Sequence, residues 1–100
     1  MVKHVILWNL KEELSETEKQ QVKKGIKDGL ESLAGKIPGL LKIQVHIEGL
    51  ESSNADVMLD SEFEDEDALK TYATHLEHVA VADTKVRPYT ARRTCMDYLV

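Results

Sequence analysis

The chain has 100 residues, the size of one domain, so a catalytic domain with a separate partner domain is excluded. Apolar residues make up 42% and charged residues 31%, values that exclude disorder, a fibrous repeat and a membrane protein. The formal net charge is −5 and no basic run offsets it, so neither nucleic acid nor a membrane is an expected partner.

Cysteine usage and the first residues bear on location. Cys95 is the only cysteine, so no intramolecular disulfide can form, and a chain that folds without one fits a reducing compartment. The first ten residues hold only a short apolar run and no targeting signal, and no stretch approaches the roughly 20 apolar residues of a membrane span. The expected location is therefore cytoplasmic.

The first element is a strand over residues 2–10, rich in β-branched and aromatic types. The face expected to pack against helices carries Val2, His4, Ile6, Trp8 and Leu10. The opposite face carries Val5 and Leu7, so the strand is apolar on both sides and is expected to lie between two layers.

A helix follows, because Ser15 and Glu18 have the spacing of a capping box. Gly25 and Gly29 lie beside its apolar stripe, which suggests that the helix approaches a sheet closely there. Glycine and proline within residues 35–39 end the helix. The stripe consists of Val22, Ile26, Leu30, Leu33 and Ile37.

The second half of the chain reads as two strands, a helix and a final strand. Residues 41–48 and 55–63 alternate between apolar and polar side chains and are predicted to form a hairpin. Acidic residues open a helix over 65–74, since negative charge suits a helix N-terminus. A short helical turn is expected within 75–87, and 90–99 is predicted to be the last strand.

The resulting order predicts an α+β, ferredoxin-like βαββαβ fold: a four-stranded antiparallel sheet with its helices on one face. Its uncovered face could pack against a second copy, so that two sheets close a barrel across a two-fold axis. A homodimer is therefore the expected partner, although polar residues leave a solvated face as the alternative. We expect the uncovered face to carry Val5, Leu7, Met58, Cys95 and Leu99, mixed with Lys42, Gln44, His46 and Asp60.

Three side chains are expected to converge between the sheet and the helices. His4 points to the helix side of its strand, Tyr72 lies on the inner face of its helix, and His78 follows shortly after. A neutral histidine can take a proton next to a carbonyl while a tyrosine hydroxyl donates to the enolate oxygen. Since residues six apart in a continuous helix point about 120° away from each other, the helix must break between Tyr72 and His78.

Each of these residues alone is explained as well by packing. A His-x-x-His pair at His75 and His78 is a weak metal signal without a third ligand, so no metal and no cofactor is predicted. Cys95 in mid-strand suits packing rather than nucleophilic catalysis. The Arg92-Arg93 pair is typical of a solvated or salt-bridged surface.

Four short motifs occur in order along the chain: Val-Lys-His-Val-Ile at 2–6, Phe-Glu at 63–64, Tyr-Ala-Thr-His-Leu-Glu-His-Val at 72–79 and Asp-Tyr at 97–98. With these motifs the whole chain resembles the stress-responsive A/B barrel (Dabb) family of dimeric α/β barrels, as a single domain over residues 2–99. The resemblance implies a ferredoxin-like protomer and a homodimer.

Polyketide-cyclase members of that family use a histidine base and a tyrosine partner in an intramolecular aldol condensation. The resemblance implies His78 as base, Tyr72 as partner and His4 as a third pocket residue. The predicted ligand-binding residues are Trp8, Val57, Leu59 and His75, the last with a structural role. Two positions depart from the cyclase pattern: Leu76 stands where it has proline, and Val57 where it has another histidine.

Three functions remain open. The first is a cofactor-free protein whose pocket takes a small apolar carbonyl or phenolic ligand, with acid–base chemistry like that of the cyclases. The second is a non-enzymatic structural or stress-related oligomer. The third is a cofactor-free, monooxygenase-like protein. Some relatives bind a divalent cation after the first helix, where residues 33–39 of this chain lack an acidic side chain.

Overall fold

The chain folds into the predicted sequence of strands and helices, and the computed structural model describes all of residues 1–100. The strands form one antiparallel sheet in the order β2-β3-β1-β4, which confirms the ferredoxin-like α+β fold. Short π-helical and 3₁₀ turns follow α3. The elements are β1 (Val2–Leu10), α1 (Glu16–Glu31), β2 (Leu40–His46), β3 (Val57–Phe63), α2 (Glu66–Thr74), α3 (Leu76–Val81) and β4 (Thr90–Leu99).

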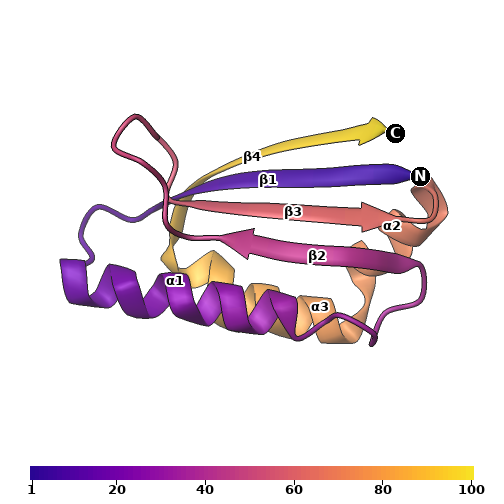
Figure 1. The fold of residues 1–100 in the computed structure, drawn as a ribbon. Helices are drawn as coiled ribbons and strands as arrows, with labels where there is room; N and C mark the ends of the chain where they lie inside the picture. Colours follow the sequence, from indigo (N-terminus) through magenta and orange to yellow (C-terminus); the bar gives the residue numbers. More distant parts are fainter.

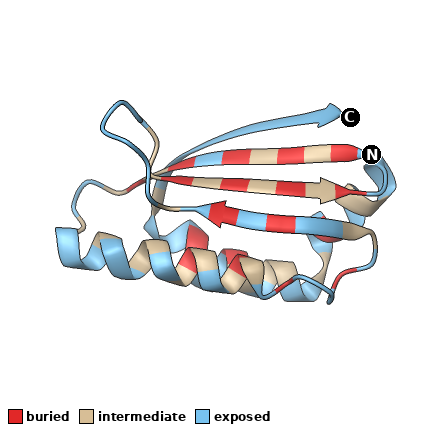
Figure 2. Cartoon of the chain, in the orientation of Figure 1, coloured by how far each residue is buried: buried red, intermediate tan, exposed pale blue.

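The core lies between the helices and one face of the sheet. α1 and α3 lie side by side along that face (Figure 1). Buried positions alternate along β1 and β3, as Figure 2 shows, because every second side chain of a strand points to the same side. The buried apolar cluster includes Ile6, Trp8, Ile26, Leu30, Leu59 and Phe63.

α1 begins where the capping box predicts and ends earlier than its apolar stripe. The Ser15 hydroxyl accepts from the Glu18 N–H at 3.1 Å, and the Glu18 carboxylate accepts from the Ser15 N–H at 3.0 Å. The helix ends at Glu31, so Leu33 and Ile37 are buried from the following loop instead.

Among the helices, none combines the length and the apolar character that a transmembrane segment requires.

The two glycines of α1 face another helix rather than the sheet, contrary to the sequence-based expectation. A Cβ placed on Gly29 would lie 2.9 Å from Cγ1 of Val81 in α3, and one on Gly25 would lie 3.9 Å from the Lys85 side chain. Real Cβ contacts are essentially never shorter than 3.0 Å. Gly29 therefore allows α1 and α3 to approach each other, which holds α3 under the sheet.

The facing of β4 was predicted wrongly. Cys95 pairs with Ile6 and Leu99 pairs with Val2, so both point to the helix side of the sheet rather than to the uncovered face. Directly opposed residues of an antiparallel pair share a face, and a shift of one residue reverses every assignment. Residues 90–99 lack a clean apolar alternation, so the sequence pattern did not determine their facing.

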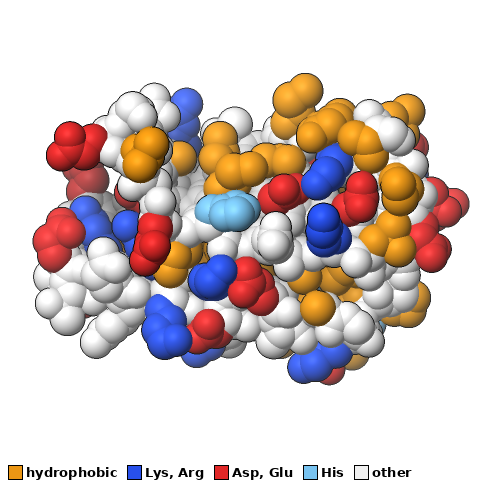
Figure 3. All heavy atoms as spheres, viewed as in Figure 1, with side chains coloured by type: hydrophobic (Ala, Val, Ile, Leu, Met, Phe, Trp, Pro, Cys, Tyr) orange, Lys and Arg blue, Asp and Glu red, His pale blue; other side chains and the backbone are white.

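The uncovered face of the sheet carries Val5, Leu7 and Met58, as predicted, together with Met96 and Tyr98 from β4. Leu7 is 38% exposed, Met96 66% and Tyr98 42%. Lys3 and Asp60 form an ion pair on the same face at 2.9 Å. Hydrophobic side chains gather along the upper part of the molecule in Figure 3, over β4 and β1. Every residue of β4 after Thr90 is exposed, unlike those of β1.

Candidate active site

A cavity of about 360 Å³ lies between the sheet and the helices. This volume lies within the range of about 300 to 1,000 Å³ that is usual for small-molecule sites. His4 and Trp8 reach it from β1, Leu59 from β3, Tyr72 from α2 and His78 from α3. The structure thus brings together five of the seven residues predicted for the site.

The predicted helix break occurs at His75. α2 ends at Thr74, and His75 has extended backbone with ψ 133° before α3 begins. Its own ring caps the new helix, because Nδ1 accepts a hydrogen bond from the Glu77 N–H at 3.1 Å. The break therefore forms without the proline of the cyclase pattern, and Leu76 at that position is 83% exposed.

The break places the rings of Tyr72 and His78 against each other, with centroids 4.1 Å apart. His78 Nδ1 lies 3.3 Å from the Ala73 carbonyl oxygen. Since a carbonyl can only accept, Nδ1 donates its proton there, which leaves the lone pair of a neutral ring on Nε2. Burial lowers the pKa of His78 below its ordinary value, so the neutral ring predominates at neutral pH. Such a ring can accept a proton.

Tyr72 is the most informative residue of the cavity. Its side chain is almost fully buried, and its hydroxyl has no hydrogen-bond partner. A buried polar group without a partner costs about 1–3 kcal/mol, so native proteins rarely keep one without a reason. Burial raises the pKa of Tyr72, which keeps the hydroxyl protonated. The cavity therefore presents an O–H donor with no acceptor inside the protein.

His4 lies on the sheet side of the cavity and is 7% exposed. Its ring meets that of Tyr72 edge to face at a centroid distance of 6.1 Å. Its Nδ1 lies 2.5 Å from an Asp97 carboxylate oxygen. His4 is thus held by the sheet, whereas Tyr72 and His78 are held by helices.

Two of the predicted ligand-binding residues do not line the cavity. Val57 is buried in the core opposite Trp8, and His75 caps α3. The Nδ1 atoms of His75 and His78 each bond to nearby backbone, and neither histidine belongs to the group of three metal-ligating side chains in the structure.

Two arginines at the cavity were not predicted. Arg87 forms an ion pair with Asp83, whereas Arg93 has no carboxylate partner. Arg93 pairs with Trp8 across the β1–β4 ladder, so it points to the helix side. The signal that could have identified Arg93 is the register of β4. The cavity consequently combines an apolar wall with one unpaired cation.

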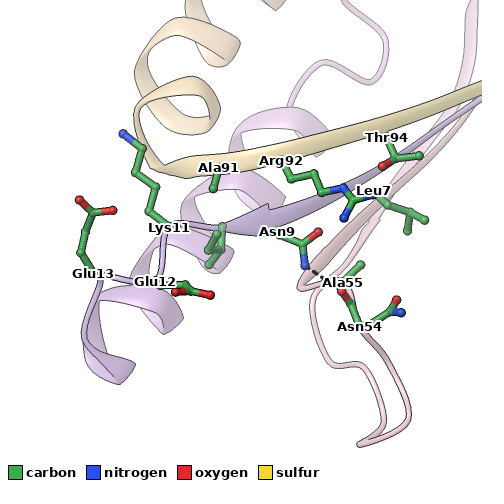
Figure 4. Close-up of a pocket in the computed structure, with 11 residues that line it drawn as sticks. Leu7, Asn9, Lys11, Glu12, Glu13, Asn54, Ala55, Ala91, Arg92 and Thr94 are labelled. Carbon is green, nitrogen blue, oxygen red and sulfur yellow. Dashed lines mark hydrogen bonds between the residues drawn. The ribbon is translucent and has the colours of Figure 1, made fainter.

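A separate depression of about 650 Å³ lies where β1 and β4 meet the loops, and it contains no histidine. Figure 4 shows its charged and polar lining, with the Asn9 side-chain amide donating to the Asn54 carbonyl oxygen at 2.7 Å. Arg92 and Lys11 line it beside Glu12, a solvated mixture of charges. None of the residues predicted for the site lies there.

The fold and the cavity define a class: a ferredoxin-like α+β protein with a His/Tyr pocket between its sheet and its helices. Within that class the sequence profile of the Stress responsive A/B Barrel Domain family (Dabb) matches residues 2–100, so the chain belongs to this family. No curated protein matches the chain in sequence.

Solved structures agree with this assignment. A Bacteroides fragilis structure, described as a dimeric protein of unknown function with a ferredoxin-like fold, is 35% identical over 97% of this chain and 93% of its own, with TM-score 0.90. A Dabb family protein from Mesorhizobium loti is 18% identical, covering 99% and 95%, with TM-score 0.75. A hydroxynitrile lyase from Passiflora edulis is 12% identical, covering 99% and 92%, with TM-score 0.72. The last two likenesses concern the fold alone.

Proposed function

We propose that the cavity binds a small, mostly apolar molecule carrying a carbonyl or phenol, and that Tyr72 and His78 perform acid–base chemistry on it without a cofactor. The observation that carries this proposal is the buried, unpartnered Tyr72 hydroxyl beside a neutral His78. A ligand oxygen in the cavity would give that hydroxyl its missing acceptor. Trp8 and Leu59 supply the apolar wall.

In the proposed step, His78 Nε2 takes a proton from the carbon next to the ligand carbonyl. The C–H electron pair forms the carbon–carbon double bond of an enolate, and the carbonyl π pair moves onto oxygen. The Tyr72 hydroxyl donates a hydrogen bond to that oxygen and stabilises the charge. The carbon can then be reprotonated or attack a second carbonyl of the same ligand, as in an aldol cyclisation.

Arg93 suggests one further feature of the ligand. Its guanidinium borders the cavity without an acidic partner, so a carboxylate or phenolate at that end would form a charge-assisted hydrogen bond. We expect Arg93→Gln to weaken binding of an acidic ligand while leaving a neutral analogue unaffected. Arg92→Gln is the matched control, because Arg92 lines the other depression. Equal losses in both variants would remove this assignment.

We also propose that the chain forms a homodimer through the uncovered face of the sheet. Support comes from the 35% identical structure described as dimeric and from the exposure of Leu7, Met96 and Tyr98 on that face. Isologous packing of two such faces would bury them across a two-fold axis. A sedimentation mass of one chain at micromolar concentration would contradict the dimer. Met96→Asp should halve the mass, whereas Leu50→Asp in a loop should not.

The test of ligand binding uses the fluorescence of Trp8, the only tryptophan. A panel of phenolic and polyketide-like compounds is titrated into the protein, and hits are repeated with Tyr72→Phe, which removes only the hydroxyl. We expect saturable quenching that weakens in Tyr72→Phe. If no compound changes the fluorescence, the non-enzymatic structural function replaces this proposal.

A further inference from the structure

Three metal-ligating side chains meet beside the cavity, on the helix side of the sheet. His4 Nδ1 lies 2.5 Å from Asp97 Oδ1 and 3.8 Å from Cys95 Sγ, and Cys95 Sγ lies 3.5 Å from Asp97 Oδ1. They form the one group of three or more such donors in the structure. The donors differ in type: an imidazole, a thiol and a carboxylate.

The sheet register holds these donors together. His4 is directly opposite Asp97, and Ile6 is directly opposite Cys95, so the two β4 residues flank the histidine on one face. All three side chains project from paired strands rather than from loops. A site built on paired strands is held more closely than one built on mobile segments.

The spacing of the donors approaches that of tetrahedral zinc. Zinc bonds of about 2.3 Å to sulfur, 2.05 Å to nitrogen and 2.0 Å to oxygen place sulfur about 3.5 Å from each other ligand and nitrogen about 3.3 Å from oxygen. Both sulfur distances here, 3.8 and 3.5 Å, are close to that value. Only the His4–Asp97 contact has to open, and the Asp97 side chain is 43% exposed, so solvent rather than packed side chains lies around much of it.

The same geometry argues against a cysteine nucleophile. In a nucleophile–base–carboxylate triad, the nucleophile and the carboxylate contact different nitrogens of the histidine. Here Cys95 Sγ and Asp97 Oδ1 both approach Nδ1. A single ion that binds all three atoms accounts for this convergence on one point, which a triad does not.

We propose that His4, Cys95 and Asp97 form a binding site for Zn²⁺ or a chemically similar divalent transition metal. Imidazole and thiolate ligands favour such ions over Mg²⁺ and Ca²⁺. Thiolate and carboxylate together neutralise the two charges of the ion. The site opens onto a depression of about 810 Å³ that Glu66, Lys70 and Arg93 also line, which leaves room for water as a fourth ligand.

This proposal is independent of the acid–base proposal, because it rests on the β1–β4 pair rather than on Tyr72 and His78. It is tested with the full chain kept reduced, by titrating Zn²⁺ against a competing chromophoric chelator and by recording the absorption spectrum with Co²⁺. We expect one ion per chain and a thiolate-to-cobalt charge-transfer band in the near ultraviolet.

The variants are Cys95→Ser and Asp97→Asn, both at exposed positions of β4, so neither disturbs the core. Loss of a side chain that only hydrogen-bonds to a metal ligand already lowers metal affinity about 10–100-fold. Because Cys95 is itself a proposed ligand, we expect Cys95→Ser to lower zinc affinity at least about 100-fold and to abolish the thiolate-to-cobalt charge-transfer band. Asp97→Asn should weaken binding while the band remains. His46→Gln and His78→Gln are the controls and should change neither readout.

Three outcomes would overturn the proposal. One is the failure of the reduced chain to bind zinc stoichiometrically. Another is a cobalt spectrum without the thiolate band. The third is an affinity that falls equally in the control variants, which would assign the binding to other histidines on the surface.

Discussion

The molecule carries two clusters of acid–base side chains whose supports differ. The helix cluster consists of Tyr72 and His78, which come from consecutive helices and meet because the helix is interrupted between them. The sheet cluster consists of His4, Cys95 and Asp97, which come from two paired strands and meet because of the register between β1 and β4. The helix cluster leaves a buried hydroxyl unpaired, whereas the sheet cluster is joined by hydrogen bonds. The comparison suggests that the helix cluster lacks a hydrogen-bond acceptor, whereas the donors of the sheet cluster pair with one another when no metal ion is bound.

The largest expected difference between the clusters is in proton transfer. We expect His78→Gln to lower the rate of proton abstraction from a bound ligand by about 10²- to 10⁴-fold, because it removes the base. Asp97→Asn should change that rate by less than about tenfold, since Asp97 neither takes nor donates a proton in the proposed step. Solvent deuterium exchange at the carbon next to the ligand carbonyl, followed by NMR, measures both. Equal losses would merge the two clusters into one site.

The free energy of unfolding should fall when a side chain of the sheet cluster is replaced, but not when the Tyr72 hydroxyl of the helix cluster is removed. His4→Phe removes the hydrogen bond to Asp97, whose side chain is 43% exposed and can be hydrated, so we expect it to lower the free energy of unfolding by about 0.5–1.5 kcal/mol. Tyr72→Phe removes an unpaired hydroxyl and keeps the ring, so the same free energy should stay constant or rise. Urea denaturation distinguishes them. A large loss in Tyr72→Phe would show that the hydroxyl has a structural partner.

The helix cluster also depends on the break at His75, which the sheet cluster does not need. Leu76→Pro places proline at the first position of α3, where no helical N–H bond is lost and the preceding residue is already extended. We expect a gain of about 0.4–1 kcal/mol, since proline restricts the unfolded chain. Thermal unfolding measures the gain. Val79→Pro, which removes the hydrogen bond from the Val79 N–H to the His75 carbonyl, is the destabilising control.

The smallest expected effect is on the pH dependence of stability. The pKa of His78 is lowered in the folded state, so the unfolded chain binds protons more readily. The contribution of the neutral His78 ring to the free energy of unfolding is fully present above the pKa of this histidine in the unfolded chain, about 6.5. It is lost as the pH falls through the lower pKa that His78 has in the folded chain. His78→Gln should flatten the stability curve in that window. The lowered pKa values of Glu18 and Glu31 act only at more acidic pH, near and below 4.5.

Much of the helix cluster could be predicted from the sequence. The place of Tyr72 on the inner face of α2 and the required helix break are local signals, and each acts within a few residues, as does the capping box at Ser15 that begins α1. The cap that stabilises the break was not predicted, because it is a hydrogen bond from the Glu77 N–H to the His75 ring, and histidine is not among the usual N-cap residues.

The sheet cluster could not be predicted for a physical reason. Arg93, Cys95 and Asp97 lie on a strand whose side chains are exposed, so no hydrophobic pattern indicates which side faces the helices. Only pairing with β1, whose partner residues lie 85 to 93 positions earlier in the chain, fixes their orientation. In the same way, the end of α1 was misplaced because Leu33 and Ile37 continue an apolar pattern that a loop buries equally well.

The pairing of Val2 with Leu99 has a consequence for how the protein reaches its native state. β1 lies in the interior of the sheet, yet one of its two neighbours is the last strand of the chain. During synthesis one edge of β1 keeps its backbone donors and acceptors free until β4 has emerged. Such non-local pairing slows folding, and an open apolar edge favours association between incomplete chains. We therefore expect folding intermediates that lack β4 to be the ones most prone to association between chains.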